Sequence, residues 1–152
     1  MKLSKNFYLS EFTKSITATR NGIDNSPSKE HISNLKDLCV NLLQPLRDAL
    51  GKPITISSGY RSPALNKFVN GSSRSQHCQG RAADIEIMIN GVECNDLIWD
   101  ILKGSSTIDY DQIINEFNLS WIHVSYDSSK IQNRKEVLYA YKDEQGNTKY
   151  RF

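Results

Sequence analysis

The residues best suited to chemistry in this chain are two histidines and one aspartate. His77 and Asp84 lie close together in the segment SQHCQGRAAD, and His123 follows much later in the segment WIHVSY. The chain contains 3 histidines, and two of them belong to this pattern. Two histidines and one carboxylate are enough to bind a catalytic zinc ion and leave one coordination position open. The pattern therefore indicates a zinc-dependent hydrolase with His77, Asp84 and His123 as metal ligands.

Two expected strands explain how these ligands meet. The strand expected over 82–89 carries Asp84, and Gly80 allows the preceding loop to turn back toward it. The strand expected over 121–126 presents His123 on the face opposite its apolar residues. This histidine is therefore available to a polar site.

A hydrolytic site also needs a base. The strand-like segments 111–117 and 121–126 predict a hairpin with a two-residue turn at Leu119-Ser120. That register places Glu116 directly opposite His123, with Cβ atoms about 5 Å apart. A solvent-exposed glutamate is the commoner situation, but the residues around Glu116 are mostly apolar. We therefore expect Glu116 to take a proton from the attacking water.

Two further polar residues could bind a substrate. Arg61 lies in the segment SGYRS, and a guanidinium can bind a carboxylate through two parallel hydrogen bonds. Ser75 could donate another hydrogen bond. Each residue alone is a weak signal, because an exposed arginine more often serves only solubility.

The composition is that of an ordinary single domain. The chain has 152 residues, of which 38% are hydrophobic and 24% charged, and its formal net charge is +2. This length supports one domain with its own core, so we expect a single domain over residues 1–152. So small a charge gives no reason to expect nucleic acid as a partner. A weakly basic surface would suit an anionic polymer such as a cell wall, although solubility is the simpler explanation.

The N-terminal segment MKLSKNFYLSEF lacks the apolar run of a signal peptide, and no segment is apolar enough to span a membrane. We therefore expect synthesis in the cytoplasm, no membrane insertion and a monomeric protein. The 3 cysteines, Cys39, Cys78 and Cys94, are an odd number without CxxC spacing, which does not favour a disulfide scaffold. A structural zinc site built from these cysteines is an alternative to the catalytic one.

The remaining pattern predicts helices and strands in an α+β fold. Residues 1–25 are polar and we expect them to be irregular, with the segment FYLSEF as a short docking piece. A helix is expected from Ser26, as the N-cap, with Pro27 at its first position, to Gly51. Pro45 should kink or divide that helix.

A strand is expected over 54–57, and an extended loop over 58–81, which is rich in Gly, Pro, Ser and Asn. A turn at Asn90-Gly91 precedes a helix over 92–103, and a terminal hairpin is expected within 127–152. The fold class is therefore a small single α+β domain with a mainly antiparallel sheet flanked by helices.

Several of these motifs occur together in a known family. The segment SGYRSP, the residues Asn66 and Gly71, and the patterns Ser-x-His-x-x-Gly-x-Ala-x-Asp (75–84) and Trp-x-His (121–123) resemble the zinc D-Ala-D-Ala carboxypeptidase and L-alanyl-D-glutamate endopeptidase family. That family cuts the stem peptides of peptidoglycan and is structurally related to the hedgehog signalling domain. The N-terminal part is similar to the branch common in bacteriophages and prophages. The resemblance covers nearly the whole chain except its end.

The resemblance implies Zn²⁺ on the two histidines and the aspartate, with Arg61 and Ser75 contacting the substrate. It implies peptidoglycan stem peptides as the partner, and an endolysin-like enzyme of phage or prophage origin that acts on the cell wall. Many members place the catalytic carboxylate where this chain has Ser120, so Glu116 is the candidate base, with Asp111 and Asp109 as weaker substitutes. A non-catalytic zinc module, as in hedgehog-like relatives, stays open, and so does the choice between carboxypeptidase and endopeptidase.

Overall fold

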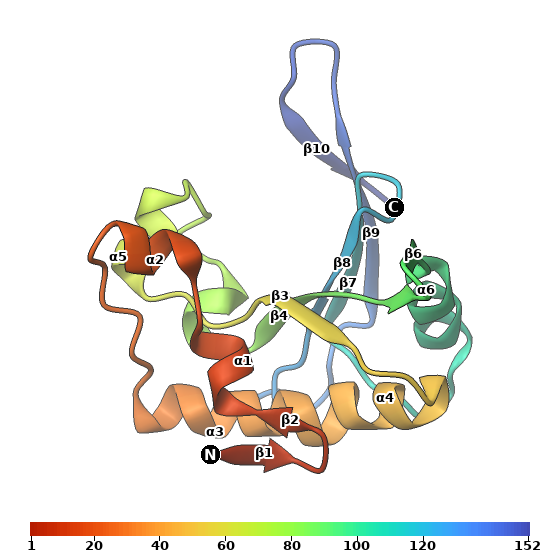
Figure 1. Ribbon diagram of the computed structural model, residues 1–152. Coiled ribbons are helices and arrows are strands. Elements are labelled where there is room, and N and C mark those ends of the chain that lie inside the picture. Colours follow the sequence, from red (N-terminus) through yellow and green to blue (C-terminus); the bar gives the residue numbers. More distant parts are fainter.

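A six-stranded mixed sheet is the framework of the protein, as the computed structural model of residues 1–152 shows (Figure 1). Its strands lie in the order β10-β9-β7-β8-β4-β3. Neighbouring strands are antiparallel except β7 and β9, which are parallel. The strand bounds are β3 Thr55–Ser58, β4 Ala82–Glu86, β7 Gln112–Glu116, β8 Trp121–Ser125, β9 Glu136–Lys142 and β10 Thr148–Arg151. The α+β class and the mainly antiparallel sheet are therefore confirmed.

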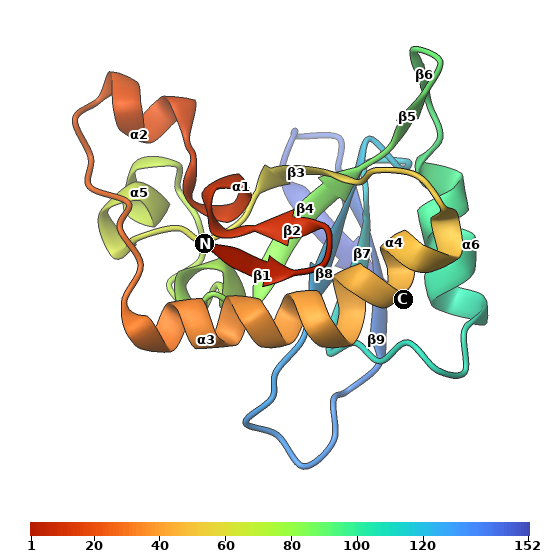
Figure 2. The same ribbon diagram turned by 60° about the horizontal axis from the view of Figure 1, so that its bottom comes forward.

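The two faces of this sheet differ in character, because side chains alternate along each strand. One face is apolar and belongs to a core cluster of 23 buried residues, which includes Ile56, Ala83, Ile85, Ile113, Ile122 and Val124. Helices α3 (Lys29–Leu38), α4 (Gln44–Leu50) and α6 (Asn95–Gly104) cover this face (Figures 1 and 2). The opposite face is left for polar side chains.

The first long helix begins later than expected. Ser28 is its N-cap: the Ser28 Oγ accepts a hydrogen bond from the His31 N–H at 3.2 Å, and the Ser28 N–H donates to His31 Nδ1 at 3.1 Å. The cap predicted at Ser26 is wrong because this reciprocal pair of hydrogen bonds forms only at Ser28. A wide π-helical turn over Cys39–Leu43 separates α3 from α4. The division expected at Pro45 is confirmed, since proline lacks an N–H and crowds the preceding turn.

The N-terminal segment is regular rather than irregular. It forms β1 (Lys2–Ser4), β2 (Phe7–Tyr8), α1 (Leu9–Thr13) and α2 (Ile16–Arg20). Its apolar side chains Leu3, Phe7 and Phe12 are buried in the main core. The prediction of an irregular segment over 1–25 is wrong because these apolar residues are too widely spaced to show a helix or strand period. The expected docking of FYLSEF is confirmed.

The segment 58–81 is also more ordered than the single extended loop that was predicted. It contains α5 (Pro63–Phe68) and a short 3₁₀ helix, η2 (Gln76–Gln79). The N-cap of α5 is Ser62, whose Oγ accepts a hydrogen bond from the Leu65 N–H at 3.2 Å. The serine-proline pair is a local helix start that the polar composition of the segment obscured.

A short hairpin follows β4. Its strands β5 (Met88–Ile89) and β6 (Val92–Glu93) pair across the predicted turn at Asn90-Gly91. The strand predicted over 82–89 is therefore split, and the helix predicted from Val92 begins only at Asn95.

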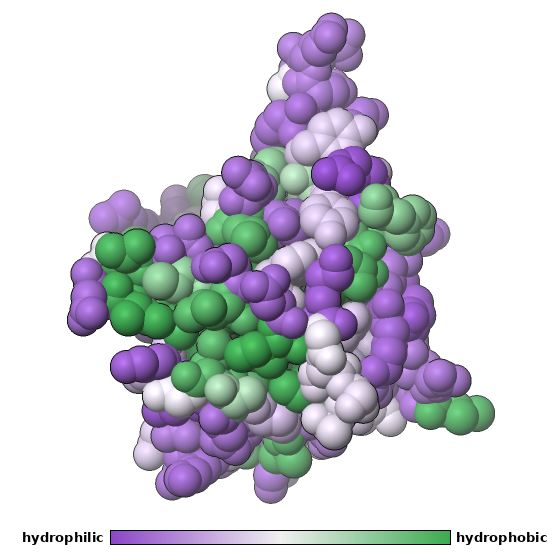
Figure 3. Space-filling model, turned by 90° about the vertical axis from the view of Figure 1, so that its right-hand side faces the viewer, coloured by the Kyte–Doolittle hydropathy of each residue, from purple (hydrophilic) through white to green (hydrophobic).

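The end of the chain forms the β9-β10 hairpin, which projects from the body of the molecule (Figure 1). The space-filling view shows that its tip is hydrophilic, whereas apolar side chains gather on the side of α6 (Figure 3). The predicted terminal hairpin therefore lies in the second part of 127–152, and residues 127–135 before it form no strand. None of the helices is long and apolar enough to cross a membrane.

Candidate metal centre and its cleft

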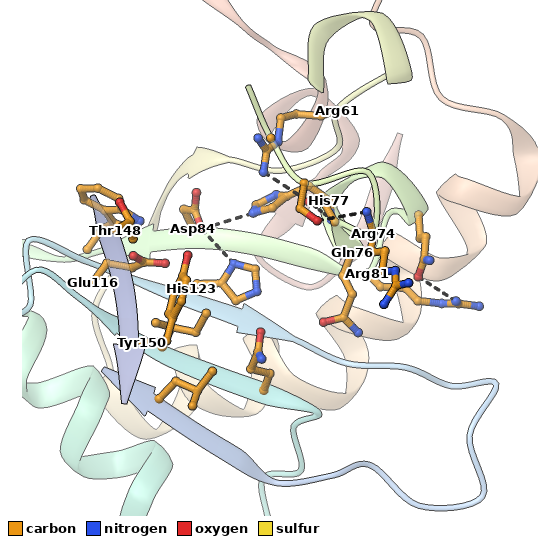
Figure 4. Close-up of a pocket in the computed structure, with 18 of the residues that line it drawn as sticks. Arg61, Arg74, Gln76, His77, Arg81, Asp84, Glu116, His123, Thr148 and Tyr150 are labelled. Carbon is orange, nitrogen blue, oxygen red and sulfur yellow. Dashed lines mark hydrogen bonds and ion pairs between the residues drawn. The ribbon is translucent and has the colours of Figure 1, made fainter. Parts of the chain in front are cut away.

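Two histidines and one aspartate converge on the open face of the sheet (Figure 4). Asp84 on β4 lies directly opposite His123 on β8, and His77 reaches them from η2. The Asp84 Oδ1 atom is 3.3 Å from His77 Nε2 and 3.2 Å from His123 Nδ1. Ligand atoms of the three residues all lie within 4.8 Å of one another. The structure thus brings together the three residues predicted as metal ligands.

The hydrogen bonds of His77 indicate that a cation belongs in this cluster. His77 Nδ1 is 2.7 Å from the carbonyl oxygen of Gly59, which can only accept, so Nδ1 carries the hydrogen. In the neutral ring, Nε2 then directs a lone pair at the Asp84 carboxylate 3.3 Å away. Two facing acceptors repel each other unless a proton or a metal ion lies between them. Ligand atoms about 2 Å from a tetrahedral zinc ion are about 3.3 Å apart, so the distances from Asp84 to the two histidines also fit Zn²⁺.

Asp84 is held as a carboxylate. Burial alone would raise the pKa of Asp84, but the charges and hydrogen bonds of His77 and His123 outweigh burial and keep this pKa well below its ordinary value. Its side chain is 20% exposed, and that of His77 is 3% exposed. The cluster therefore offers a negative oxygen and two ring nitrogens in a largely dry place, which is the donor set that zinc prefers.

The local sequence explains the position of His77. Ser75 is the N-cap of η2, and its Oγ accepts a hydrogen bond from the His77 N–H at 3.2 Å. Gly80 ends η2 with a φ of 72°. A Cβ at this position would lie 2.6 Å from the backbone oxygen of His31, so glycine is needed for the backbone angle and for the contact. The predicted turn at Gly80 is confirmed.

Glu116 lies on the same face as the metal cluster, but in a different register from the predicted one. In the β7-β8 pair Glu116 is opposite Trp121, and Ile114 is opposite His123. The predicted two-residue turn is instead a loop over 117–120 that contains residues with positive φ. The register prediction is therefore wrong. Because the shift is even-numbered, it leaves Glu116 on the predicted face of the sheet.

The environment of Glu116 suits a base. Its exposed fraction is 8%, and it lines the same cleft as the metal cluster. Burial raises the pKa of Glu116 to about 7; the neighbouring His123 acts against this rise and Asp84 adds to it. A carboxyl group with a pKa near neutrality can both accept and return a proton.

The three other positions considered for the base are occupied differently. Asp111 is fully buried and accepts hydrogen bonds from Lys130 and Arg134. Asp109 pairs with Lys135 at 3.5 Å and lies outside the cleft, and the Ser120 Oγ donates to a backbone oxygen in its own loop. None of these groups lines the cleft beside the metal cluster. Asp127 does line the cleft, but it pairs with Arg81 at 3.3 Å, which leaves Glu116 as the candidate base.

Arg61 and Ser75 lie together at one side of the cleft. Arg61 Nη2 donates to Ser75 Oγ at 3.4 Å, and the Arg61 backbone N–H donates to the carbonyl of His77 at 3.1 Å. The Arg61 Nε is buried and has no partner. Gly71 allows the guanidinium to pack closely, since a Cβ there would be 2.9 Å from Arg61 Nη1 and 2.0 Å from Asn66 Oδ1. The guanidinium is thus held beside the cluster with donors to spare for an anionic group.

All of the predicted site residues line one cleft of about 940 Å³. They are Arg61, Ser75, His77, Asp84, Glu116 and His123. The sequence did not identify two further groups of lining residues. At one end lie polar residues of η2 and of the segment 127–134, and at the other end lie Lys142, Thr148 and Tyr150 of the β9-β10 hairpin.

Asp111 links η2 to the chain beyond β8. It accepts from Gln76 Nε2 at 3.0 Å, from Lys130 Nζ at 3.0 Å and from Arg134 Nη2 at 2.9 Å. Gln76 precedes His77, so this buried carboxylate stabilises the short helix that carries the candidate ligand. The only sequence signal for Gln76 was that it precedes His77. Asp111 was considered only as a weaker substitute for the base, and its contact with Gln76 was not predicted.

A metal cluster with an open side, a buried carboxylate and a fixed arginine in one cleft defines the centre of a hydrolytic metalloenzyme. The comparison with known families agrees with this class. Residues 5–125 match the model of the family described as Peptidase M15. The chain belongs to this family, as the resemblance predicted.

One curated relative is the zinc D-Ala-D-Ala carboxypeptidase of Streptomyces albus G, which is 50% identical to the chain over 44 residues. The match covers 28% of this chain and 17% of that protein, so the chain corresponds to less than two thirds of its relative. The family and this relative both point to Zn²⁺ as the metal. The cysteines give no rival site, since all three are free and none belongs to the metal cluster.

Proposed function

We propose that the protein is a zinc-dependent peptidase that hydrolyses a peptide bond in the stem peptides of peptidoglycan. The observation that carries the proposal is the convergence of three metal ligands and the buried Glu116 in one cleft. The membership in the Peptidase M15 family and the short match to a zinc D-Ala-D-Ala carboxypeptidase support the same conclusion.

His77, Asp84 and His123 would hold the metal. A zinc ion bound there would polarise the scissile carbonyl and make an attacking water more acidic. Glu116 accepts the proton of that water and then donates it to the leaving amine. Its pKa of about 7 suits both transfers, because neither the carboxylate nor the carboxylic acid is strongly disfavoured near neutral pH.

Arg61 and Ser75 orient the substrate. The unused donors of the Arg61 guanidinium bind a carboxylate of the D-amino-acid part of the stem peptide, and the Ser75 hydroxyl adds a hydrogen bond. Peptidoglycan stem peptides carry such carboxylates both at their C-terminus and on their D-glutamate. Both a D-Ala-D-Ala carboxypeptidase and an L-alanyl-D-glutamate endopeptidase could therefore use this residue pair.

The proposal extends to the biological setting. We infer an endolysin-like monomer of phage or prophage origin, which acts on the cell wall and has no nucleic acid partner. The resemblance of the N-terminal segment to phage and prophage members supports this origin. A non-catalytic zinc module is the alternative, and the buried carboxylate of Glu116 beside the cluster disfavours it, because a binding module has no need of a base.

The test is digestion of purified muropeptides by the zinc-loaded protein, followed by mass spectrometry of the products. We expect hydrolysis of one peptide bond, and the product masses identify that bond. Release of D-alanine would indicate a carboxypeptidase, and separation of L-alanine from D-glutamate an endopeptidase. If the protein binds zinc but hydrolyses no muropeptide, the peptidase proposal is wrong and the non-catalytic module is favoured.

A further inference from the structure

Tyr150 on the C-terminal hairpin lines the cleft beside the metal cluster. It lies outside residues 5–125, which match the Peptidase M15 family, so no family pattern assigns it a role. Like the rest of β10 it is exposed, with an exposed fraction of 55%. The strand pairings explain why it reaches the site.

A row of paired residues runs across the sheet from β8 to β10. Trp121 pairs with Glu116, Glu116 with Ala140, and Ala140 with Tyr150. Directly paired residues share a face of the sheet, so Tyr150 is on the same face as Glu116. Neighbouring strands are about 4.8 Å apart, and only Ala140 stands between the two residues. Its methyl group leaves room for the Tyr150 ring to lean inward over it.

The side chain points toward the chemistry. In Figure 4 Tyr150 extends from β10 toward Glu116, His123 and Asp84. Its electrostatic environment agrees with this position: burial raises the pKa of the Tyr150 phenol, and the charges of Glu116 and Asp84 raise it further. A tyrosine phenol has an ordinary pKa of about 10, so Tyr150 is protonated at neutral pH and offers an O–H donor.

This donor complements the other groups of the cleft. Glu116 can accept and return a proton, and Arg61 and Ser75 lie on the opposite side of the cluster, on the η2 side of the cleft. A hydrolytic site gains most from a fixed donor aimed at the oxygen on which charge develops. On the hairpin side of the cleft, Tyr150 has a neutral hydroxyl that lies close enough to Glu116 and Asp84 to feel their charges.

We propose that the Tyr150 hydroxyl donates a hydrogen bond to the oxygen of the scissile carbonyl as negative charge develops there during hydrolysis. Tyr150 is then a catalytic residue supplied by the hairpin. This role rests on the proposed peptidase function. It involves no proton transfer by Tyr150, because the phenol keeps its hydrogen throughout.

The experiment compares Tyr150→Phe with the control Tyr141→Phe in the full-length, zinc-loaded protein. Tyr141 lies next to Ala140 on β9, so its side chain is on the opposite face of the same hairpin. Each protein is measured for kcat and KM on the muropeptide that the wild type cleaves. Calorimetry adds the affinity for the phosphinate analogues of D-Ala-D-Ala and of L-Ala-D-Glu, whose charged tetrahedral group resembles the transition state.

We expect Tyr150→Phe to lower kcat at least about tenfold with KM changed less than about twofold, and to weaken phosphinate binding by a similar factor. Tyr141→Phe should match the wild type in both measurements. The proposal is wrong if Tyr150→Phe raises only KM, or if kcat and phosphinate affinity both stay within about twofold of the wild type.

Failure of the proposed function is distinguishable from failure of this inference. A wild-type protein that cleaves no muropeptide would contradict the peptidase function. The phosphinate affinities of the wild type and of Tyr150→Phe would still be compared in that case. Equal affinities, or no binding by the wild type, would overturn the role of Tyr150.

Discussion

Replacing Glu116 by glutamine should abolish most hydrolysis and leave the metal in place. The substitution keeps the shape of the side chain, so a position that is only 8% exposed loses no packing. It removes the carboxylate that we propose accepts the proton of the attacking water. The three metal ligands are unchanged.

The size of the effect follows from the contacts of the neighbouring acids. A positioned base typically contributes about 10²–10⁴ in rate, or roughly 3–5 kcal/mol of transition-state stabilisation. Asp111 is fully buried and bound by Arg134 and Lys130, and Asp109 lies outside the cleft, so neither replaces Glu116. We therefore expect kcat to fall by at least about 10³, toward the upper part of that range.

The assay is separation and mass spectrometry of muropeptide products over time, with zinc content measured on the same samples. Glu86→Gln is the matched control, since Glu86 lies on the same face of β4 as Asp84 but outside the cleft. It should retain wild-type rates. A Glu116→Gln protein with full activity would refute the assignment of the base, and loss of zinc from that variant would mean that Glu116 is a ligand instead.

Three further predictions concern the metal, the pH profile and stability. Replacing all three free cysteines should leave one zinc per chain, measured by atomic absorption, and loss of zinc would favour a cysteine site. Because the pKa of Glu116 is about 7 without metal and its carboxylate form accepts the proton, kcat/KM should fall as the pH drops through this pKa. A bound zinc ion lowers the pKa of Glu116, so the fall in kcat/KM should be centred below about pH 7. If the residual activity of Glu116→Gln shows the same fall in kcat/KM, another group causes it. Asp111→Ala should lower the free energy of unfolding in urea by about 2 kcal/mol at neutral pH, because Gln76, Lys130 and Arg134 lose a charged acceptor. The cost is not larger because the Lys130 and Arg134 side chains are 35% and 47% exposed and stay partly solvated, and a cost below about 0.5 kcal/mol would contradict this. Burial would raise the pKa of Asp111, but the hydrogen bonds of Arg134 and Lys130 hold it well below its ordinary value. This stability is therefore present above about pH 4 and is lost as the pH falls further, so the wild type should lose more stability in acid than the variant does.

The convergence of the three candidate metal ligands could be predicted because local signals fix their positions. The spacing of His77 and Asp84, with Gly80 between them, predicted a turn followed by a strand, and the structure contains both. The short helix η2 that carries His77 was not predicted. Strand alternation was enough to place His123 on the polar face of β8. These features depend on residues close together in the sequence, which is why the sequence reveals them.

The position of Glu116 was predicted only in part, because its register depends on distant contacts. Asn95 on α6 donates to the carbonyl oxygens of Leu119 and Ser120, and Asn115 accepts from the Leu119 N–H at 2.7 Å. These bonds stabilise a longer loop than the two-residue turn that the local sequence favoured. The resulting shift keeps Glu116 on the predicted face of the sheet. The prediction that Glu116 lies near the cluster therefore holds, although the predicted pairing with His123 is wrong.

The hairpin side of the cleft could not be predicted at all. The sequence predicts a terminal hairpin, but it carries no signal that β9 pairs with β7 in parallel. That long-range pairing is what brings Tyr150 to the face of Glu116. The structural role of Asp111, which was considered only as a substitute base, could not be predicted either, because its partners Lys130 and Arg134 lie in a segment without regular structure.

Removal and return of zinc tests the central claim most directly. The wild-type protein is stripped with a chelator, assayed on the muropeptide, and assayed again after zinc is added, beside a variant in which His123 is replaced by alanine. We predict one zinc per wild-type chain, loss of cleavage on stripping, recovery on adding zinc, and neither zinc nor recovery in His123→Ala. Cleavage that continues at the full rate in the stripped wild type, or zinc-restored cleavage in His123→Ala, would contradict the account.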